Sequence, residues 1–364
     1  MAAAKANAAD FSVENLKDIS NYLLLAKFGA TAFVGFAPEP PISFLKQARG
    51  FGLQQQLLEN HTLKIFSKNR IDTRARDETG QKIYREVTGT FLTTKLLTPK
   101  SYLFITKDSG EFVNDGLARL LYRVRKNVSR LHLNSGEMKE IVSGLVLETS
   151  GRLVVRRSIL RNKRQETTVS YETEYLDDLY SKAASDDAHV HSFAFKLYDK
   201  QNKRLLLNAG VNREGRFSFY EGDLRLFILH LIERASQLVK KKDDLLQHRA
   251  RSARTGEINP IRITFDEPVF DKPAGIKALL ATLGKIRHGE FTIFHRNPYL
   301  HVSFFDFFDA SEFEVFVDSA ESLVVVPQYE STSPSLFRFC QKIFENFQEG
   351  TVADDTATVR IAVQ

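Results

Sequence analysis

Lysine and arginine side chains gather in several stretches of the sequence whose chemistry suits phosphate groups. A guanidinium group binds phosphate through paired hydrogen bonds, and an ammonium group binds it as a point charge. A chain of phosphodiesters is therefore the ligand that these clusters favour, although each cluster on its own could also be a solvated charged face. The candidate residues are Arg123, Arg125 and Lys126; Arg152, Arg156, Arg161, Lys163 and Arg164; and Lys203, Arg204, Arg213 and Arg216.

Charge is unevenly distributed along the 364 residues, which carry +6 in total. Residues 61–170 contain 22 Lys and Arg against 11 Asp and Glu, a net charge of +11. Residues 301–350 contain 2 against 9, a net charge of −7. The basic part suits contacts to a polyanion, whereas the acidic part repels one within a Debye length of about 10 Å. The acidic part is better suited to a protein partner or to the basic surface of the chain itself.

The cluster at 152–164 has the pattern of two strands joined by a tight turn at 161–164. Strict alternation places Arg152, Val154 and Arg156 on one face of the first strand and Arg157 on the other. Proteins that bind single-stranded nucleic acid present basic sheet faces with aromatic residues among the charges. The sequence therefore favours this cluster over the others as a binding surface.

The elements that position these residues follow a recurring order of strands and then a helix. The pattern is clearest at 189–240, where three strand candidates precede Leu224, Phe227, Ile228 and Leu231, which are spaced for one helix face. The same order returns at 299–348 and, more faintly, at 83–130. The predicted fold class is α+β, built from tandem repeats of a small antiparallel sheet followed by an amphipathic helix.

The predicted organisation places a repeat on either side of residue 140 and a third after a basic linker. The domains are an N-terminal helical or irregular segment 1–60, repeats at 61–140 and 141–240, the linker 241–256, an acidic repeat at 257–350 and a tail at 351–364. Positive charge is concentrated in the first two repeats, so residues 61–256 are expected to carry the binding of nucleic acid.

Residues 201–220 resemble the core of a PUR repeat, the repeat of the purine-rich-element-binding family. The resemblance rests on Asn202-Lys203-Arg204, on Asn212 and on Gly215-Arg216-Phe217. Whirly proteins share the same design of strands followed by a helix. The resemblance implies sequence-tolerant binding of single-stranded DNA or RNA through Lys203, Arg204, Arg216 and Phe217.

The resemblance weakens outside the middle repeat. The third repeat has no Lys-Arg pair and no Gly-Arg-Phe, and Phe313-Glu-Val-Phe316 stands instead. The first has Ser109-Gly110-Glu-Phe112, which lacks the arginine. From the residues alone, Phe217 has a competing interpretation as a core side chain.

Aromatic residues in the acidic repeat indicate a second kind of surface. Alternation places Phe304 and Phe308 on one face of a strand and Phe305 and Phe307 on the other. A helix covers one face of a small sheet, so the other face would expose aromatic rings, and large exposed apolar patches are usually interfaces. Phe304 and Phe308 are the predicted protein-interface residues, facing another repeat, a second copy of the chain or a partner protein.

The sequence contains no signature of catalysis, of a cofactor or of a metal site. The single cysteine, Cys340, can form neither an intrachain disulfide nor a cysteine-based zinc site. His189 and His191 have no third ligand near them in sequence, and Asp306, Asp309 and neighbouring acidic residues lack a Gly-centred calcium loop. We expect a non-enzymatic protein that binds single-stranded nucleic acid, RNA in the first instance. The alternative is a scaffold subunit of a ribonucleoprotein or other complex.

The N-terminal residues do not resemble a targeting segment. Residues 1–30 mix Lys with Asp and Glu, whereas a mitochondrial presequence is rich in Arg and poor in acids. The apolar stretch 22–37 is interrupted by Lys27 and two glycines and is too short to span a bilayer. We expect no membrane association and a reducing intracellular compartment, the cytoplasm or nucleus. The mitochondrial matrix is compatible if a presequence has been removed.

Overall fold

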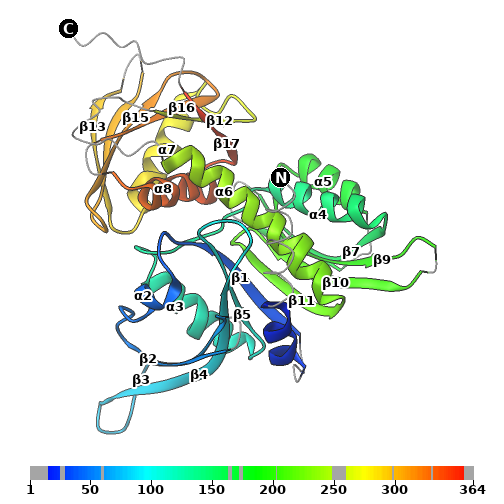
Figure 1. Ribbon diagram of the computed structural model, residues 1–364. Coiled ribbons are helices and arrows are strands. Elements are labelled where there is room, and N and C mark those ends of the chain that lie inside the picture. Colours follow the sequence, from blue (N-terminus) through cyan, green and yellow to red (C-terminus); the bar gives the residue numbers. More distant parts are fainter. Residues whose placement is uncertain are drawn as a thin grey trace. The chain divides into compact units, whose positions relative to one another are not determined.

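The computed structural model describes residues 15–24, 29–58, 61–162, 166–171, 175–201, 203–247, 260–296, 299–328 and 331–355. The chain divides into two units, Met1–Val239 and Lys240–Gln364, and each is described here by itself. Each unit combines helices with one antiparallel sheet (Figure 1), which confirms the predicted α+β class.

The first unit begins with helical residues 15–23 and contains a sheet of eleven strands. Its strands are β1 (Ala30–Phe36), β2 (Phe51–Leu57), β3 (Leu63–Arg76), β4 (Lys82–Lys95), β5 (Ser101–Thr106), β6 (Ser129–Arg130), β7 (Arg152–Asn162), β8 (Thr167–Ser170), β9 (Ala188–Tyr198), β10 (Leu205–Asn212) and β11 (Arg216–Gly222). Its helices are α2 (Pro41–Leu45), α3 (Arg119–Arg123), α4 (Ser135–Thr149), α5 (Leu176–Ser185) and α6 (Glu233–Gln247), with the π-helical segments η1 (Phe112–Ala118) and η2 (Leu226–Ile232).

The strand order is β2-β3-β4-β5-β1-β11-β10-β9-β7-β8, with β6 paired to β1. Strand β1, near the N-terminus, lies between β5 and β11 and is antiparallel to both (Figure 1). Each of these two flanking strands is followed by a π-helical segment that continues into an α-helix. Strands of the predicted first and second repeats therefore belong to a single sheet, which the N-terminal β1 completes.

The two halves of this sheet are covered on opposite faces. In the half formed by β3, β4 and β5, η1 and α3 pack on one face around Phe91, Phe104 and Leu117. In the half formed by β11, β10, β9 and β7, helices α4 and α5 and the η2–α6 segment pack on the other face around Phe195 and Phe217. Helical periodicity explains the burial, because the predicted stripe Phe227, Ile228 and Leu231 faces this second core.

The second unit is a six-stranded sheet with two helices on one face. Its elements are β12 (Ile261–Phe265), α7 (Pro273–Lys285), β13 (Gly289–His295), β14 (His301–Asp306), β15 (Ser311–Val317), β16 (Ser322–Pro327), α8 (Ser333–Asn346) and β17 (Gly350–Asp354), and the strand order is β13-β14-β15-β16-β12-β17. Leu336, Phe339 and Ile343 of α8 are buried in its core, as their spacing predicts. The helix begins after Thr332, whose hydroxyl accepts a hydrogen bond from the Ser335 amide.

Several segments differ from the sequence-based expectation. Helix α6 continues to Gln247, which is one of the two alternatives for the basic linker, extension of the preceding helix or disorder, while 248–256 lies outside the described residues. The expected C-terminal tail begins with β17, which pairs with β12. Helix α4 was not anticipated. None of the helices in the described ranges is long and apolar enough to cross a bilayer.

Candidate nucleic-acid interface

Among the described residues of the first unit, no helix packs on one face of β7, β9, β10 and β11, except where Asn114 of η1 reaches Arg216 at the β11 edge. The opposite face carries Val155, Phe195, Ala209 and Phe217, all fully buried in the core. The alternate residues of the same strands therefore point away from that core. We call this surface the open face; it comprises Arg152, Val154, Arg157, Ile159, Arg161, His189, Ser192, Ala194, Lys196, Tyr198, Asn208, Gly210, Asn212, Arg216, Ser218 and Tyr220.

The cross-strand register arranges small side chains at the middle of the open face. Ala194 pairs with Gly210, and Gly210 pairs with Ser218 of the next strand. Arg157 stands at the end of this row, opposite Ala194. Small residues let a backbone or a flat ring approach a sheet closely. Short side chains thus occupy the middle of the face, where Gly210 itself is buried, while longer basic side chains stand towards its ends.

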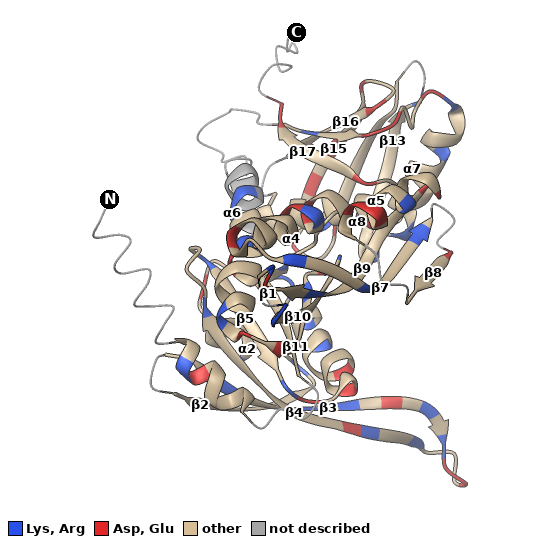
Figure 2. Ribbon diagram, turned by 90° about the vertical axis from the view of Figure 1, so that its right-hand side faces the viewer, with Lys and Arg blue, Asp and Glu red and all other residues tan. Residues whose placement is uncertain are grey.

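A β-bulge corrects the predicted faces of the β7 arginines. The pairing of β7 with β9 skips Arg156: Val155 pairs with Phe195 and Arg157 with Ala194. A bulge places one extra residue on a strand, so the alternation shifts after it. Arg157 therefore lies on the open face with Arg152, not opposite it, and Arg156 is also exposed. Figure 2 shows Lys and Arg positions on the strands of this part of the sheet.

Exposed tyrosines accompany the arginines of β7. The Arg152 guanidinium donates to the Tyr175 hydroxyl at 2.9 Å and lies 5.7 Å from the centre of that ring. The Arg157 guanidinium lies 5.5 Å from the centre of the Tyr171 ring. Tyr220 is the extra residue of a second bulge, and its hydroxyl lies 3.5 Å from where a Cβ of Gly210 would be. Rings that are exposed next to cations can stack on nucleobases.

The electrostatic environment at one end of the open face is strongly positive. His189 pairs across strands with Arg161. Burial, together with the cationic neighbours Arg213, His191 and Arg161, lowers the pKa of His189 to about 3. His189 is therefore neutral at physiological pH. An anion placed here would be attracted by the arginines without a proton being taken up first.

The basic residues of the middle repeat lie at opposite ends of β10. The sequence indicated that Lys203, Arg204, Arg213 and Arg216 gather at one hairpin. Lys203 and Arg204 are exposed just before β10 begins, whereas Arg213 and Arg216 follow its last residue. A strand of eight residues spans about 25 Å, so the two pairs occupy different hairpins.

Two of the predicted binding residues are buried. Phe217 is 0 % exposed in the core, opposite Val211 and Ala32, so it cannot stack on a base in this structure. Arg213 is 3 % exposed, and its backbone amide donates to the carbonyl of His191. Arg216 is half-buried on the open face, where it donates to Asn114 of η1 at 3.2 Å, and burial lowers its pKa.

The remaining basic candidates belong to other surfaces or lie outside the described ranges. Arg123, Arg125 and Lys126 are located at the end of α3 and just after it, in the other half of the sheet. The Arg125 guanidinium lies 3.8 Å from the centre of the exposed Tyr122 ring. Lys163 and Arg164 are outside the described residues.

The structure also corrects the placement of the two interface phenylalanines in the second unit. Phe304 is 1 % exposed and lies on the helix-covered face, 5.0 Å from Phe339 of α8 between ring centres. Phe308 follows the end of β14 and is half-buried, with the Arg338 guanidinium 5.2 Å from its ring. The face of the sheet away from α7 and α8, here called the outer face, presents instead Phe305, Phe316 and acidic side chains.

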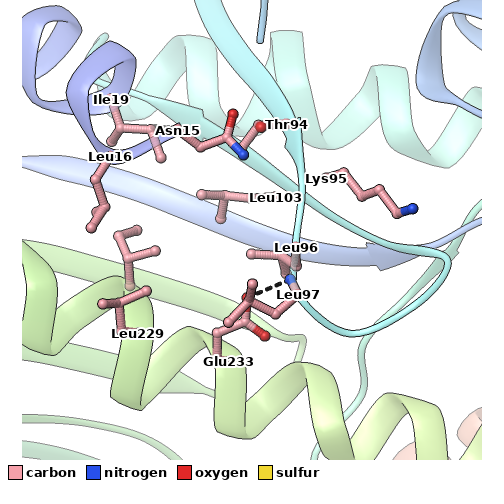
Figure 3. Close-up of a pocket in the computed structure, with 11 residues that line it drawn as sticks. Asn15, Leu16, Ile19, Thr94, Lys95, Leu96, Leu97, Leu103, Leu229 and Glu233 are labelled. Atoms are coloured by element: carbon pink, nitrogen blue, oxygen red, sulfur yellow. Dashed lines mark hydrogen bonds between the residues drawn. The ribbon is translucent and has the colours of Figure 1, made fainter. Parts of the chain in front are cut away.

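A small cavity between β4, β5 and η2 carries no chemistry of its own. It is lined mainly by leucines and isoleucines, with the buried carboxyl of Glu233 at its edge (Figure 3). Burial raises the pKa of Glu233. Its oxygens accept hydrogen bonds from the Leu97 amide at 2.7 Å and the Ser236 hydroxyl at 2.9 Å. Glu233 therefore attaches the β4–β5 turn to α6.

Within the described residues, no three His, Cys, Asp or Glu side chains come together as a metal site. Asp306 and Asp309, which resemble metal ligands in sequence, both accept hydrogen bonds from Arg338 at 2.8 Å. Comparison with known proteins gave no match to any family model and no match to a curated protein.

Proposed function

We propose that the protein binds single-stranded nucleic acid, RNA in the first instance, on the open face of the first unit and without catalysis. The observation that carries the proposal is the combination of small central residues and arginines on one sheet face with exposed tyrosines beside those arginines. Bases stack on aromatic rings irrespective of sequence, and arginines neutralise phosphates. This combination suits an unpaired strand, whose bases are free to contact a surface.

The strand order supports the finer proposal of tandem repeats. Strands β3, β4 and β5 followed by η1, and strands β9, β10 and β11 followed by η2, lie symmetrically about β1. A PUR-like or Whirly-like arrangement would have this form, with a third copy in β14, β15, β16 and α8. The single cysteine, which is buried, agrees with a reducing intracellular compartment.

A second candidate function is that of a scaffold subunit, and the outer face of the second unit favours it. Phe305 and Phe316 lie there among Glu312 and Glu314, and Phe294 and Phe307 are exposed at its margins. Aromatic residues beside acids suit a protein surface with basic residues, not a polyanion. Both functions can reside in one chain, because the two surfaces belong to different units.

The proposal is tested with the full chain and labelled oligonucleotides of about 20 nucleotides. Fluorescence anisotropy would compare single-stranded RNA, single-stranded DNA and duplex RNA between about 50 and 200 mM salt. We expect single strands to bind more tightly than duplex, with affinity that falls steeply as salt increases. Substituting Arg152, Arg156 and Arg157 together by Glu should weaken binding at least about tenfold and reduce the salt slope by about 0.7 per lost contact.

The matched control replaces three exposed cations by Glu: Lys46 and Arg49, which follow α2, and Lys95 at the end of β4. This variant has the same net charge as the β7 variant, so it separates a local contact from a general electrostatic effect. Equal losses in the two variants would refute binding on the open face. Unchanged binding in the β7 variant, with assembly weakened by F305S and F316S, would favour the scaffold function.

A further inference from the structure

The edge strand β2 combines exposure with an absence of charge. Its sequence, Phe-Gly-Leu-Gln-Gln-Gln-Leu, contains no Lys, Arg, Asp, Glu or Pro. It ends the sheet order and pairs only with β3, and Leu57 is 62 % exposed. An edge strand presents unpaired amides and carbonyls, and native proteins normally protect such edges with charges, prolines, bulges or short length.

The other sheet edges among the described residues carry such protection. Strand β8 has only four residues. Strand β17 ends in Asp354, and β13 contains Glu290 and an irregular register near His295. The contrast indicates that β2 is covered in the functional state of the protein.

The hydrogen bonds of β2 define which backbone groups are available. The Leu58 amide donates to the Thr62 carbonyl at 2.8 Å, and β2 and β3 pair in that same register without a bulge. In an antiparallel pair, residues alternate between bonding to the partner strand and pointing away from it. Gly52, Gln54 and Gln56 therefore bond to β3, and the amides and carbonyls of Phe51, Leu53, Gln55 and Leu57 point to the free edge.

We infer that β2 pairs with β2 of a second copy of this chain, in an antiparallel register centred on Gln54. Two strands related by a twofold axis at Gln54 place Leu53 opposite the partner's Gln55, and Phe51 opposite the partner's Leu57. All of these are residues whose backbone groups point to the free edge, so the hydrogen-bonding pattern is complete. The pairing joins two sheets into one.

In this register the side chains of β2 are complementary to those of β2 in the second copy. Phe51 and Leu53 already pack at the margin of the core under η1, on the same face as Leu57. The exposed Leu57 would cover the partner's Phe51 and extend that core across the twofold axis. On the opposite face Gln54 meets the partner's Gln54, and side-chain amides can bond to each other. No like charges are opposed, which makes a second copy a better occupant than a charged peptide.

The proposed pairing can be tested with two variants that each dimerise weakly alone but should dimerise with each other. A charge at position 54 is opposed by the same charge across the axis, so Q54K and Q54E should each weaken the dimer about tenfold. An equimolar mixture of the two should dimerise again. The control is Q56E, on the same face, because position 56 is opposed by the partner's Gly52 and should leave the dimer intact. Sedimentation of the full chain at up to about 100 µM measures all four cases.

The register is tested by cross-linking. In a non-hydrogen-bonded antiparallel pair the Cα atoms are about 4.5 Å apart, within the range of a disulfide. Q54C should therefore form a disulfide-linked dimer on mild oxidation and Q56C should not, and the one native cysteine, Cys340, is buried. A wild-type chain that is monomeric at about 100 µM, or a dimer that Q54C fails to link, would overturn the inference.

Discussion

Each of the two sheets has one face on which no helix packs among the described residues, and the charged side chains on these two faces have different partners. On the outer face of the second unit the charges satisfy one another: Arg262 bonds to Asp355 at 3.2 Å and also to Asp318, and Glu312 accepts from Ser303 at 2.9 Å. On the open face of the first unit, Arg152 contacts a tyrosine hydroxyl, Arg157 a tyrosine ring and Arg216 an asparagine amide. Arginines that have no carboxylate partner among the described residues can neutralise phosphates, and this releases the cations condensed on a polyanion.

A surplus of charged side chains therefore indicates a binding surface only where those side chains are not already paired with groups of opposite charge. Both units carry arginines beside aromatic rings, since Arg338 lies over Phe308 as Arg157 lies over Tyr171. Arg338, however, already bonds to two carboxylates, whereas Arg157 is exposed. Arg338 stabilises the turn between β14 and β15, whereas the Arg157 guanidinium is available to a ligand.

The largest expected effect separates the two faces of the second sheet. Replacing Phe304 by Ala removes a fully buried ring from the core and should destabilise this unit by about 3–5 kcal/mol. Replacing the neighbouring Phe305, on the outer face, should cost about 1 kcal/mol or less. Hydrogen exchange of peptides covering β14 and β15 measures the local stability of this unit within the full chain. Equal protection in the two variants would mean that the core and outer faces are assigned incorrectly.

Removing single tyrosines should weaken RNA binding without unfolding the first unit. We expect Y171A, Y175A and Y220A each to lose about 1–3 kcal/mol of binding free energy if a base stacks on that ring. The exposed phenylalanines of the second unit provide the control, and F294A and F307A should leave the dissociation constant unchanged. Anisotropy titrations measure both sets. A loss in the second set equal to that in the first would remove the distinction between the two faces.

Acidification should destabilise the first unit through His189. Because the pKa of His189 is lowered to about 3 in the folded chain, from about 6.5 when unfolded, the unfolded state takes up a proton first. Stability is full above about pH 6.5 and falls as the pH decreases towards 3. H189N should therefore lose less stability than the wild type between about pH 7.5 and 5, as measured by urea unfolding. An identical pH dependence in the two proteins would contradict the lowered pKa of the half-buried His189.

The smallest effect concerns the acids of the outer face. Glu312 and Glu314 make side-chain contacts with Ser303 and His301, and contacts of this kind near a surface contribute about 1 kcal/mol or less each. E312Q combined with E314Q should change thermal stability slightly and should not create RNA binding by an isolated second unit. Measurable RNA binding by that fragment would show that acidic repulsion alone distinguishes the two faces.

Local periodicity predicted those elements whose burial is decided by neighbours in sequence. The stripe at Leu336, Phe339 and Ile343 forms a helix whose buried face is the predicted one, and the stripe after β11 does the same. Helix α4 was missed although Asn134 and Glu137 form a capping box, a signal that is legible in the sequence.

The candidate surface was harder to predict because pairing between distant strands determines it. The bulge at Arg156 depends on how β7 pairs with β9, and no local pattern reveals it. Phe217 is buried because β1, more than 180 residues earlier in the chain, pairs with β11 beside it. The exposed tyrosines proposed to stack on bases are Tyr171 and Tyr175, in connecting segments, and Tyr220, at a bulge. Neither periodicity nor the family resemblance identifies residues at such positions.

The central position of β1 has a consequence for synthesis of the chain. Residues 30–33 of β1 pair with residues 216–219 of β11, so this part of the strand lacks a partner on one side until nearly two hundred further residues have been made, whereas residues 35 and 36 pair earlier with β6. At about 5–20 residues per second, the ribosome needs about 10 to 40 s to produce them. During that time β1 can pair with β5 but remains an open edge, exposed to misassembly. We expect delayed closure of the sheet to make protection of this edge by chaperones advantageous during synthesis of the first unit.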